Sequence, residues 1–209
     1  MYTGIVQATC ALSFVVRKPN LLHFGLCLPS ALSADVTLGA SIAVNGCCFT
    51  VTSMMPSGQG LDVTFDAIDE TQAITNVKHF EQGSIVNVER SAKQNAEVGG
   101  HVLSGHIVGT AEVVDIEKDE NRCRMTFGAD APWLKYVFEK GYLAVNGASL
   151  TVAALDRSTH AFAINLIPET LERTNFSLLS VGDPVNIEVE SQTQVIVDTV
   201  ERVLAERYA

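Results

Sequence analysis

The stretch AVNGCCFTV at residues 43–51 recurs as AVNGASLTV at residues 144–152, with six of nine positions identical at an offset of 101. In both copies an Asn-Gly pair lies between short apolar runs, which is a strong signal for a tight turn. Each copy therefore predicts a β-hairpin, with Cys48 or Ser149 just past the turn.

The similarity between the two halves of the chain extends beyond this hairpin. At the same offset, Gly4-Ile5-Val6 corresponds to Gly105-His106-Ile107. After the hairpin the offset falls to 99, where Glu70-Thr71 corresponds to Glu169-Thr170. The change falls within residues 54–63, whose Pro and Gly residues suit a surface loop. We therefore predict one unit of about ninety residues that occurs twice.

Within the first unit, short apolar and β-branched runs alternate with turn residues. The candidate strands are residues 4–8, 22–27, 41–44, 49–52, 62–66 and 84–88. This spacing predicts a small antiparallel barrel or sandwich. Helices are expected at residues 29–34 and 132–140, and single helical turns near residues 70–73 and 169–172. A polar linker at residues 91–100 separates the units.

The end of the chain differs in kind from both units. Between residues 192 and 208, apolar side chains recur with helical steps at Ile196, Val200, Val203 and Leu204. This stripe predicts a helix that either packs on its own barrel or joins copies of the chain, because a narrow apolar stripe suits a coiled-coil seam.

Composition limits the class of protein. The 209 residues are 47% hydrophobic and 18% charged, which is typical of a globular protein. The net charge of −10 argues against nucleic acid or an anionic membrane surface as a partner. The sequence shows no secretory signal and no membrane span. Five cysteines cannot form a full set of disulfides, so we expect reduced thiols and a cytoplasmic location.

Candidate chemistry is concentrated where the two units differ. Common metal, nucleotide and hydrolase motifs are absent from the sequence, and we predict no metal site. Cys48 can be read as a small buried residue or, together with His106, as a thiol and its base if the fold brings the two units together. Ile5 becomes His106 and Cys48 becomes Ser149 in the second unit. Such exchanges of polar groups are typical of a duplicated pocket whose halves have taken different roles.

The chain resembles the riboflavin synthase family, which is built of two lumazine-binding repeats. The resemblance covers essentially the whole chain, through YTGIV (2–6), SIAVNGCCFTVT (41–52), GGHVLSGHIVGT (99–110), KGYLAVNGASLTV (140–152), LIPETLERTN (166–175) and VDTVERVLAERY (197–208). It implies an all-β fold of two six-stranded Greek-key barrels plus a C-terminal helix. The corresponding domains are residues 1–97, 98–188 and 189–209.

The resemblance also implies an activity. Two molecules of 6,7-dimethyl-8-ribityllumazine exchange a four-carbon unit, giving riboflavin and 5-amino-6-ribitylamino-pyrimidinedione without a cofactor. A homotrimer is implied, with one substrate in the N-terminal barrel of one subunit and the other in the C-terminal barrel of a neighbour. A lumazine synthase is a further candidate partner. Much of the acceleration is expected from aligning the two rings.

By the same resemblance, the groups nearest the chemistry are Cys48, His106, Ser149, Ser41, Asn146 and Tyr2, with His106 moving the proton. The pocket of the first unit is expected from Gly4, Ile5, Val6, Cys48, Phe49, Thr50, Asp66, Ala67, Ile68, Asp69, Glu70 and Thr71. The pocket of the second unit is expected from Gly105, His106, Ile107, Lys140, Ser149, Leu150, Thr151, Asn165, Leu166, Ile167, Pro168 and Glu169. Thr50 and Thr151 are expected to hydrogen-bond the ring, and the backbone near Ala67 and Leu166 to read its pyrimidine edge.

Two positions depart from the family pattern. Tyr2 stands where the family usually has Phe, which keeps the ring and adds a phenol. Asn146 stands where the family usually has Asp, so it cannot act as a base; it either reduces activity or shapes the turn. The alternative function is a non-catalytic, antenna-type lumazine-binding protein. A flavin-dependent oxidoreductase is disfavoured because no nicotinamide-binding unit follows the barrels.

Overall fold

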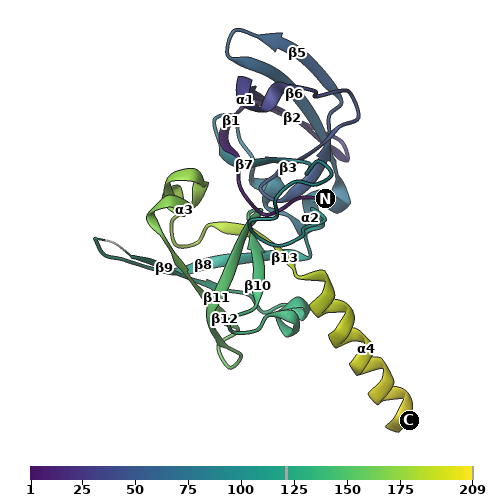
Figure 1. Cartoon of the computed structure of the whole chain (residues 1–209), viewed down its shortest axis with the longest axis vertical. Helices are drawn as coiled ribbons and strands as arrows, with labels where there is room; N and C mark the ends of the chain where they lie inside the picture. Colours follow the sequence, from purple (N-terminus) through teal and green to yellow (C-terminus); the bar gives the residue numbers. More distant parts are fainter. Residues whose placement is uncertain (121, 209) are drawn as a thin grey trace.

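The computed structural model describes residues 1–120 and 122–208. It contains two β-barrels that lie against one another and a long helix that extends away from the second barrel (Figure 1). The expected fold class, two tandem barrels with a C-terminal helix, is confirmed.

Both copies of the repeated stretch form the predicted hairpin. Strands β3 (Ser41–Val44) and β4 (Cys47–Thr50) pair in the first barrel, and β10 (Tyr142–Val145) pairs with β11 (Ala148–Asp156) in the second. The turn residues Asn45 and Asn146 have φ angles of 45° and 44°, and each is followed by a Gly with positive φ. Two consecutive left-handed residues are what a tight hairpin turn requires, which explains the Asn-Gly pair.

The second barrel is a closed ring of six strands. Its strands are β8 (Gly109–Lys118), β9 (Cys123–Gly128), β10, β11, β12 (Ala161–Leu166) and β13 (Pro184–Val189). Their order around the barrel is β10-β11-β12-β9-β8-β13. Because β10, β11 and β12 follow one another as hairpins and β13 returns beside β10, the connection is a Greek key.

The first barrel repeats this order with one strand divided. Its further strands are β1 (Ala8–Lys18), β2 (Leu21–Pro29), β5 (Ser53–Ser57), β6 (Gly60–Ile68) and β7 (Ile85–Arg90), in the order β4-β3-β7-β1-β2-β6-β5. The chain between β4 and β5 is two residues long, so β4 and β5 together take the place of β11. The Thr52 amide donates to the Thr64 carbonyl (2.9 Å) at this junction.

Three local predictions need correction. Residues 4–6 lie outside any strand, and β1 begins only at Ala8. Residues 54–63, expected as a loop, form most of the β5–β6 hairpin; Pro56 is tolerated there because β5 pairs only with β6. The helix expected at 132–140 is a short 3₁₀ turn, η2 (Pro132–Tyr136), because the backbone becomes extended at Val137.

The remaining short helices are α1 (Ser30–Ser33), α2 (Asp69–Ile74), η1 (Asn76–His79), α3 (Pro168–Arg173) and η3 (Asn175–Leu178). Three of them, α1, α2 and α3, follow the predictions, whereas the 3₁₀ turns η1 and η3 were not predicted. The helices α2 and α3 occupy equivalent places after β6 and β12. Each is followed by a Thr whose hydroxyl accepts the N–H of the residue two positions on, Val77 or Phe176, and so starts the next 3₁₀ turn.

Each barrel has its own apolar core, yet each core contains one residue from the other unit. Val6 is packed in the core of the second barrel, and Ile107 is packed in the core of the first. We call residues 4–6 and 105–107 the crossing segments. Their exchange means that neither barrel completes its core from its own unit alone.

Two buried carboxylates hold the crossing segments in place. Glu89 accepts hydrogen bonds from the backbone N–H groups of Thr3 (2.6 Å) and Gly4 (3.1 Å), and Glu188 accepts them from those of Ser104 (2.6 Å) and Gly105 (3.0 Å). Burial raises the pKa of both carboxyl groups, while these hydrogen bonds oppose the rise. The repeated Glu therefore fixes where each segment leaves its own barrel.

The repeated asparagines connect the barrels. Asn87 donates to the Asn146 carbonyl (3.0 Å), and its equivalent Asn186 donates to the Asn45 carbonyl (2.9 Å). The backbone N–H of Asn175 donates to the Asn87 side chain (2.7 Å). These residues are buried, and the pattern has an approximate two-fold symmetry. Residues that the two units share thus form the contact between the units.

The last helix, α4 (Ser191–Tyr208), confirms the predicted helix and extends away from both barrels (Figure 1). Lys135 of η2 forms ion pairs with Asp198 (3.1 Å) and Glu201 (2.6 Å). The apolar stripe at Val195, Ile196, Val200, Val203 and Leu204 is between 48% and 65% exposed, so it does not pack on its own barrel. None of the helices in the described part of the chain has the length and apolar character needed to cross a bilayer.

Candidate active site

A cavity of about 290 Å³ lies where the first crossing segment meets the second barrel. Of the predicted site residues, it is lined by Gly4, Ile5, Val6, Ser149, Leu150 and Glu169. The sequence-based grouping assigned Gly4 to Val6 to the pocket of their own unit. The structure places them in the pocket of the other unit, because the crossing segment carries them there.

Ser149 is tightly held at one side of this cavity. Its N–H donates to the Gly4 carbonyl (2.8 Å), and its Oγ lies 2.6 Å from Nδ1 of His101. A Cβ on Gly4 or on Gly100 would come within 2.5 Å of the Ser149 Cβ, so only glycine allows this approach. The Gly-Gly pair before His101 therefore serves close packing.

His101 is a site residue that sequence reasoning missed. Its ring is buried, stacks on Tyr142 at a centroid distance of 5.2 Å, and has its pKa lowered by burial. No role was expected for it from the sequence, although it lies within the stretch GGHVLSGHIVGT (99–110). In the sequence, the one indication of a role for His101 is its position directly after Gly99-Gly100. Its contact with Ser149 depends on the tertiary structure.

The equivalent position of the first barrel is Cys48. Its N–H donates to the Gly105 carbonyl (3.0 Å), and its Sγ accepts a hydrogen bond from the Tyr2 phenol (3.0 Å). Burial is the main cause that raises the pKa of Tyr2, so the phenol keeps its proton and acts as the donor. The structure therefore brings Cys48 and the segment that contains His106 together across the two units.

Three further residues near Cys48 differ in their exposure and contacts: His106, Ser41 and Cys47. The His106 side chain is exposed, next to the Gly105 carbonyl that meets Cys48. Ser41 pairs with Thr50 across the hairpin and accepts a hydrogen bond from Ser91 Oγ at its carbonyl (2.9 Å). Cys47 points into the core, where burial raises its pKa to about 12. Of the two adjacent thiols, Cys48 is the one within reach of a ligand.

Asn146 has a different environment from the other catalytic candidates. It is 1% exposed at the contact between the barrels, where its Oδ1 accepts from the Asn186 N–H (2.8 Å) and from the Asn76 side chain (3.2 Å). It is not among the residues that line the cavity beside Ser149. This placement agrees with the alternative that Asn146 shapes the turn, and it disagrees with a catalytic position.

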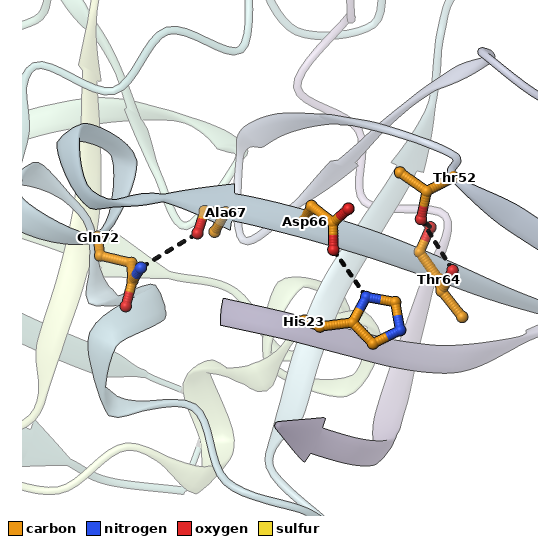
Figure 2. Close-up of polar contacts among 6 residues, drawn as sticks. All are labelled: His23, Thr52, Thr64, Asp66, Ala67 and Gln72. Atoms are coloured by element: carbon orange, nitrogen blue, oxygen red, sulfur yellow. Dashed lines mark hydrogen bonds and ion pairs between the residues drawn. The ribbon is translucent and has the colours of Figure 1, made fainter. Parts of the chain in front are cut away.

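Basic residues face the equivalent positions Asp66 and Asn165. His23 Nδ1 lies 2.7 Å from the Asp66 carboxylate on the neighbouring strand, as Figure 2 shows. Arg124, the counterpart of His23, lies 3.5 Å from the Asn165 side chain. In the same view, Gln72 of α2 donates to the Ala67 carbonyl (3.1 Å). The strand end is thereby fixed to the helix that follows it.

The other predicted site residues have matching environments in the two barrels. Ile68 and Ile167 are exposed at the starts of α2 and α3, where an apolar ring could rest on them. Six further predicted residues are exposed: Thr50, Asp69, Glu70, Thr151, Pro168 and Glu169. Thr71 is half-buried, and the side chains of Phe49, Ala67 and Leu166 are buried. Phe49 belongs to the core of the first barrel, so only its backbone can meet a ligand.

Lys140 occupies an unusual backbone position. Its φ of 64° is in the left-handed region that favours glycine, and its counterpart Gly39 has a φ of 82°. In both turns the N–H donates to a strand carbonyl at 2.9 Å, that of Val152 or Val51. A lysine held in this conformation places an ammonium group where the first barrel has none.

A metal centre and a larger cavity are the alternatives to this site. Within residues 1–120 and 122–208, no cluster of three or more His, Cys, Asp or Glu side chains could hold a metal ion. A larger cavity of about 810 Å³ lies between the 91–97 linker and the first barrel. Its lining contains none of Cys48, His106 and Ser149. We therefore assign the site to the hairpins.

Known proteins share this arrangement. A family model described as a lumazine binding domain matches residues 3–91 and again residues 104–190. Riboflavin synthase of Escherichia coli is 46% identical over 208 residues, covering 99% of this chain and 95% of the relative. The chain belongs to the riboflavin synthase family.

Further relatives and solved structures are similar to this chain at lower identity. The riboflavin synthase of Chlamydia pneumoniae is 38% identical and covers 98% of both chains. That of Bacillus subtilis is 36% identical, covering 91% of this chain and 85% of the relative. Among solved structures, LumP in complex with riboflavin is 27% identical with a TM-score of 0.81, covering 91% of this chain and 100% of that one. LumP in complex with 6,7-dimethyl-8-(1'-D-ribityl) lumazine is 25% identical with a TM-score of 0.79, covering 91% and 99%.

Proposed function

We propose that this chain is a riboflavin synthase that converts two molecules of 6,7-dimethyl-8-ribityllumazine into riboflavin and 5-amino-6-ribitylamino-pyrimidinedione. The observation that carries the proposal is the pair of equivalent hairpin positions, Cys48 and Ser149. The backbone N–H of each residue donates to the crossing segment that lies against its barrel. Two similar pockets with different polar groups suit a reaction between two identical substrates that take different roles.

The reaction balances between its two substrate molecules. One lumazine gives up a four-carbon unit and the other accepts it, so atoms and electrons are conserved and no cofactor is required. The chemical demands are loss of a proton from the methyl group on C7 of one lumazine and addition of a nucleophile to the other. Holding the two rings in register supplies much of the acceleration, and acid–base groups supply the rest.

The roles we assign follow the placement of the side chains. Around the first pocket, His106 moves the proton, Cys48 acts as nucleophile or orienting group, and Tyr2 supports Cys48. Ser41, which pairs with Thr50 across the hairpin, adds a further polar group. Around the second pocket, Ser149 and Lys140 contact the ligand. Thr50 and Thr151 hydrogen-bond the rings, while the backbone near Ala67 and Leu166 reads the pyrimidine edge.

We further propose a homotrimer joined by α4. The supporting observation is the exposed apolar stripe of this helix, which no part of the described chain covers. In such a trimer the first pocket of one subunit faces the second pocket of a neighbour. The five free cysteines fit a cytoplasmic protein, and lumazine synthase, which would supply the substrate, is a candidate partner.

A second candidate function is suggested by the similarity to LumP, whose solved structures hold lumazine, riboflavin or flavin mononucleotide. A non-catalytic chain of this kind would bind lumazine and leave it unchanged. Stoichiometry separates the candidates, because a synthase needs two occupied pockets and an antenna needs one.

The deciding experiment mixes the purified protein with 6,7-dimethyl-8-ribityllumazine alone and follows absorbance and fluorescence. The proposal predicts repeated turnover with one riboflavin formed for every two lumazines consumed. Bound lumazine that persists without riboflavin would instead support the antenna function. A variant with both Cys48→Ser and Ser149→Ala is the control for non-enzymatic conversion.

A further inference from the structure

The buried imidazole of His101 and the hydroxyl of Ser149 form an isolated pair beside the second pocket. Nδ1 of His101 lies 2.6 Å from Ser149 Oγ. The other ring nitrogen, Nε2, is buried and has no hydrogen-bond partner among the described residues. The ring therefore makes one side-chain hydrogen bond within this part of the chain, to a residue lining the cavity, and Glu190 is the charged group that acts on it.

The position of this pair is over-determined by its surroundings. Gly4 fixes the Ser149 backbone through its carbonyl, and Gly100 lies so close that a Cβ would come within 2.8 Å of Ser149 Oγ. Tyr142 stacks on the ring of His101 with an interplanar angle of 18°. Neither partner of the pair is free to turn away, so the Ser149 oxygen is held at one place beside the cavity.

We propose that His101 is a positioning residue, which orients the Ser149 hydroxyl so that it donates its proton to an acceptor atom of the lumazine in the second pocket. This inference rests on the proposed function and deepens it. It assigns a role to His101, which was not indicated by the hairpin repeat or by the polar differences between the units.

The direction of the hydrogen bond follows from the burial of Nε2. Burial lowers the pKa of His101, so at neutral pH the ring carries one proton. A buried N–H without an acceptor is rarer and more costly than a buried nitrogen lone pair without a donor. The proton is therefore on Nδ1, which donates to Ser149 Oγ. The Ser149 proton is then free to point at the ligand, where carbonyl oxygens and ring nitrogens of lumazine are the available acceptors.

In the first barrel a different side chain holds the polar group at the hairpin position. There the Tyr2 phenol donates to Cys48 Sγ. In both pockets a buried donor therefore holds the polar atom at the hairpin position. The two donors differ in kind, and the different polar groups they hold, a thiol and a hydroxyl, suit the different roles of the two substrate molecules.

The test uses His101→Leu, which removes the donor, and His101→Asn, whose side-chain amide can place an N–H near the position of Nδ1. We expect His101→Leu to lower kcat about tenfold with a smaller change in KM, as for loss of one oriented hydrogen bond. His101→Asn should recover most of that loss. Tyr142→Phe, which keeps the stacked ring and loses only its exposed phenol, is the matched control.

A double-mutant cycle separates positioning from general damage. Because His101 acts through Ser149, the kcat of His101→Leu combined with Ser149→Ala should equal that of Ser149→Ala alone. Multiplied losses in the double variant, an unchanged kcat in His101→Leu, or equal defects in the Leu and Asn variants would each overturn the inference. Thermal melting of every variant identifies any loss that comes from unfolding.

Failure of the proposed function has a separate signature. If the wild-type chain binds 6,7-dimethyl-8-ribityllumazine without forming riboflavin, the synthase proposal fails. The inference is then measured by fluorescence titration with the same compound. His101→Leu should weaken binding at one of the two pockets about tenfold and His101→Asn should restore it; equal affinities for the wild type and His101→Leu would overturn it.

Discussion

The phenol of Tyr2 shows how one oxygen atom can connect a terminal residue to a pocket. The ring is buried, the backbone pairs with Leu103, just before the second crossing segment, and the hydroxyl donates to Cys48. At this scale, the exchange of Cys48 for Ser149 between the units lies at the pockets. The residues that the units share, such as the asparagines and Glu89, hold the structure together.

Replacing Tyr2 by Phe tests this contact. The ring stays and the hydrogen bond to Cys48 is lost, so the free energy of unfolding should fall by about 1 kcal/mol. Denaturant unfolding measures the change. Tyr208→Phe, at an exposed residue of α4, is the matched control, and equal effects of the two substitutions would show that the Tyr2 hydroxyl stabilises nothing.

Cys48→Ser and His106→Gln probe the chemistry of the first pocket. Each keeps a polar group of similar size, so lumazine binding should change little. Turnover should fall by about a hundredfold if these groups act on protons or as nucleophile. Steady-state kinetics and fluorescence titration give the two quantities, with the exposed His160→Gln as control. Equal losses of binding and turnover would contradict the assigned roles.

The buried His101 predicts a pH dependence of stability. Its folded-state pKa is below the ordinary value of 6.5 because the charged ring is buried. Below pH 6.5 the unfolded chain takes up a proton that the folded chain does not, so stability is lost as the pH falls from 6.5 through the folded pKa. Melting curves of the wild type should therefore decline relative to His101→Asn in that range. Parallel pH profiles would contradict the assignment.

At the scale of elements, the crossing segments decide how the barrels are built. Each leaves its own unit, contributes one side chain to the other core and returns: Gln7 N–H bonds to the Val88 carbonyl, and Val108 N–H bonds to the Ile187 carbonyl. An element of three residues thus supplies a pocket wall and a core residue to the opposite barrel.

Ile107→Ala measures the value of this exchange. The side chain is 7% exposed in the core of the first barrel, so its truncation should leave a cavity and cost about 2–4 kcal/mol. Ile74→Ala, at a residue that is 44% exposed, should cost far less. Calorimetry or denaturant titration gives both values. A small effect at Ile107 would mean that the segment rests on the barrel without completing its core.

At the scale of the whole molecule, α4 is the one long element that the described barrels leave uncovered. Its middle turns are tied to η2 by Lys135, and the Tyr136 phenol also donates to Asp198 (2.6 Å). These polar contacts set the direction of the helix. The apolar stripe remains available for equivalent helices of other subunits.

Deletion of residues 192–209 tests assembly. We expect the shortened chain to be monomeric by light scattering and to have strongly reduced turnover, because the first pocket of one subunit would no longer face the second pocket of another. The barrels should stay folded, since the stripe contributes nothing to their cores. A shortened chain that remains trimeric would place the subunit contact elsewhere.

The duplication, the two hairpins and the terminal helix were predictable from the sequence because each depends on neighbours along the chain. Asn-Gly turns, apolar periodicity and the fixed offset are local or repetitive signals. The prediction for residues 4–6 failed because their partners are distant in the sequence. Residues 4–6 look like a strand by composition, yet their contacts are with a barrel that begins about a hundred residues later.

The architecture of each unit, and the comparison of Cys48 with Ser149, followed from the order of amino acids. The folded chain was needed to show which segments line which pocket, that Asn146 lies between the barrels, and that His101 contacts Ser149. The physical reason is that a pocket is made by surfaces packing together. Chain crossing and burial determine which polar residues reach the pocket, and neither produces a periodic pattern in the sequence.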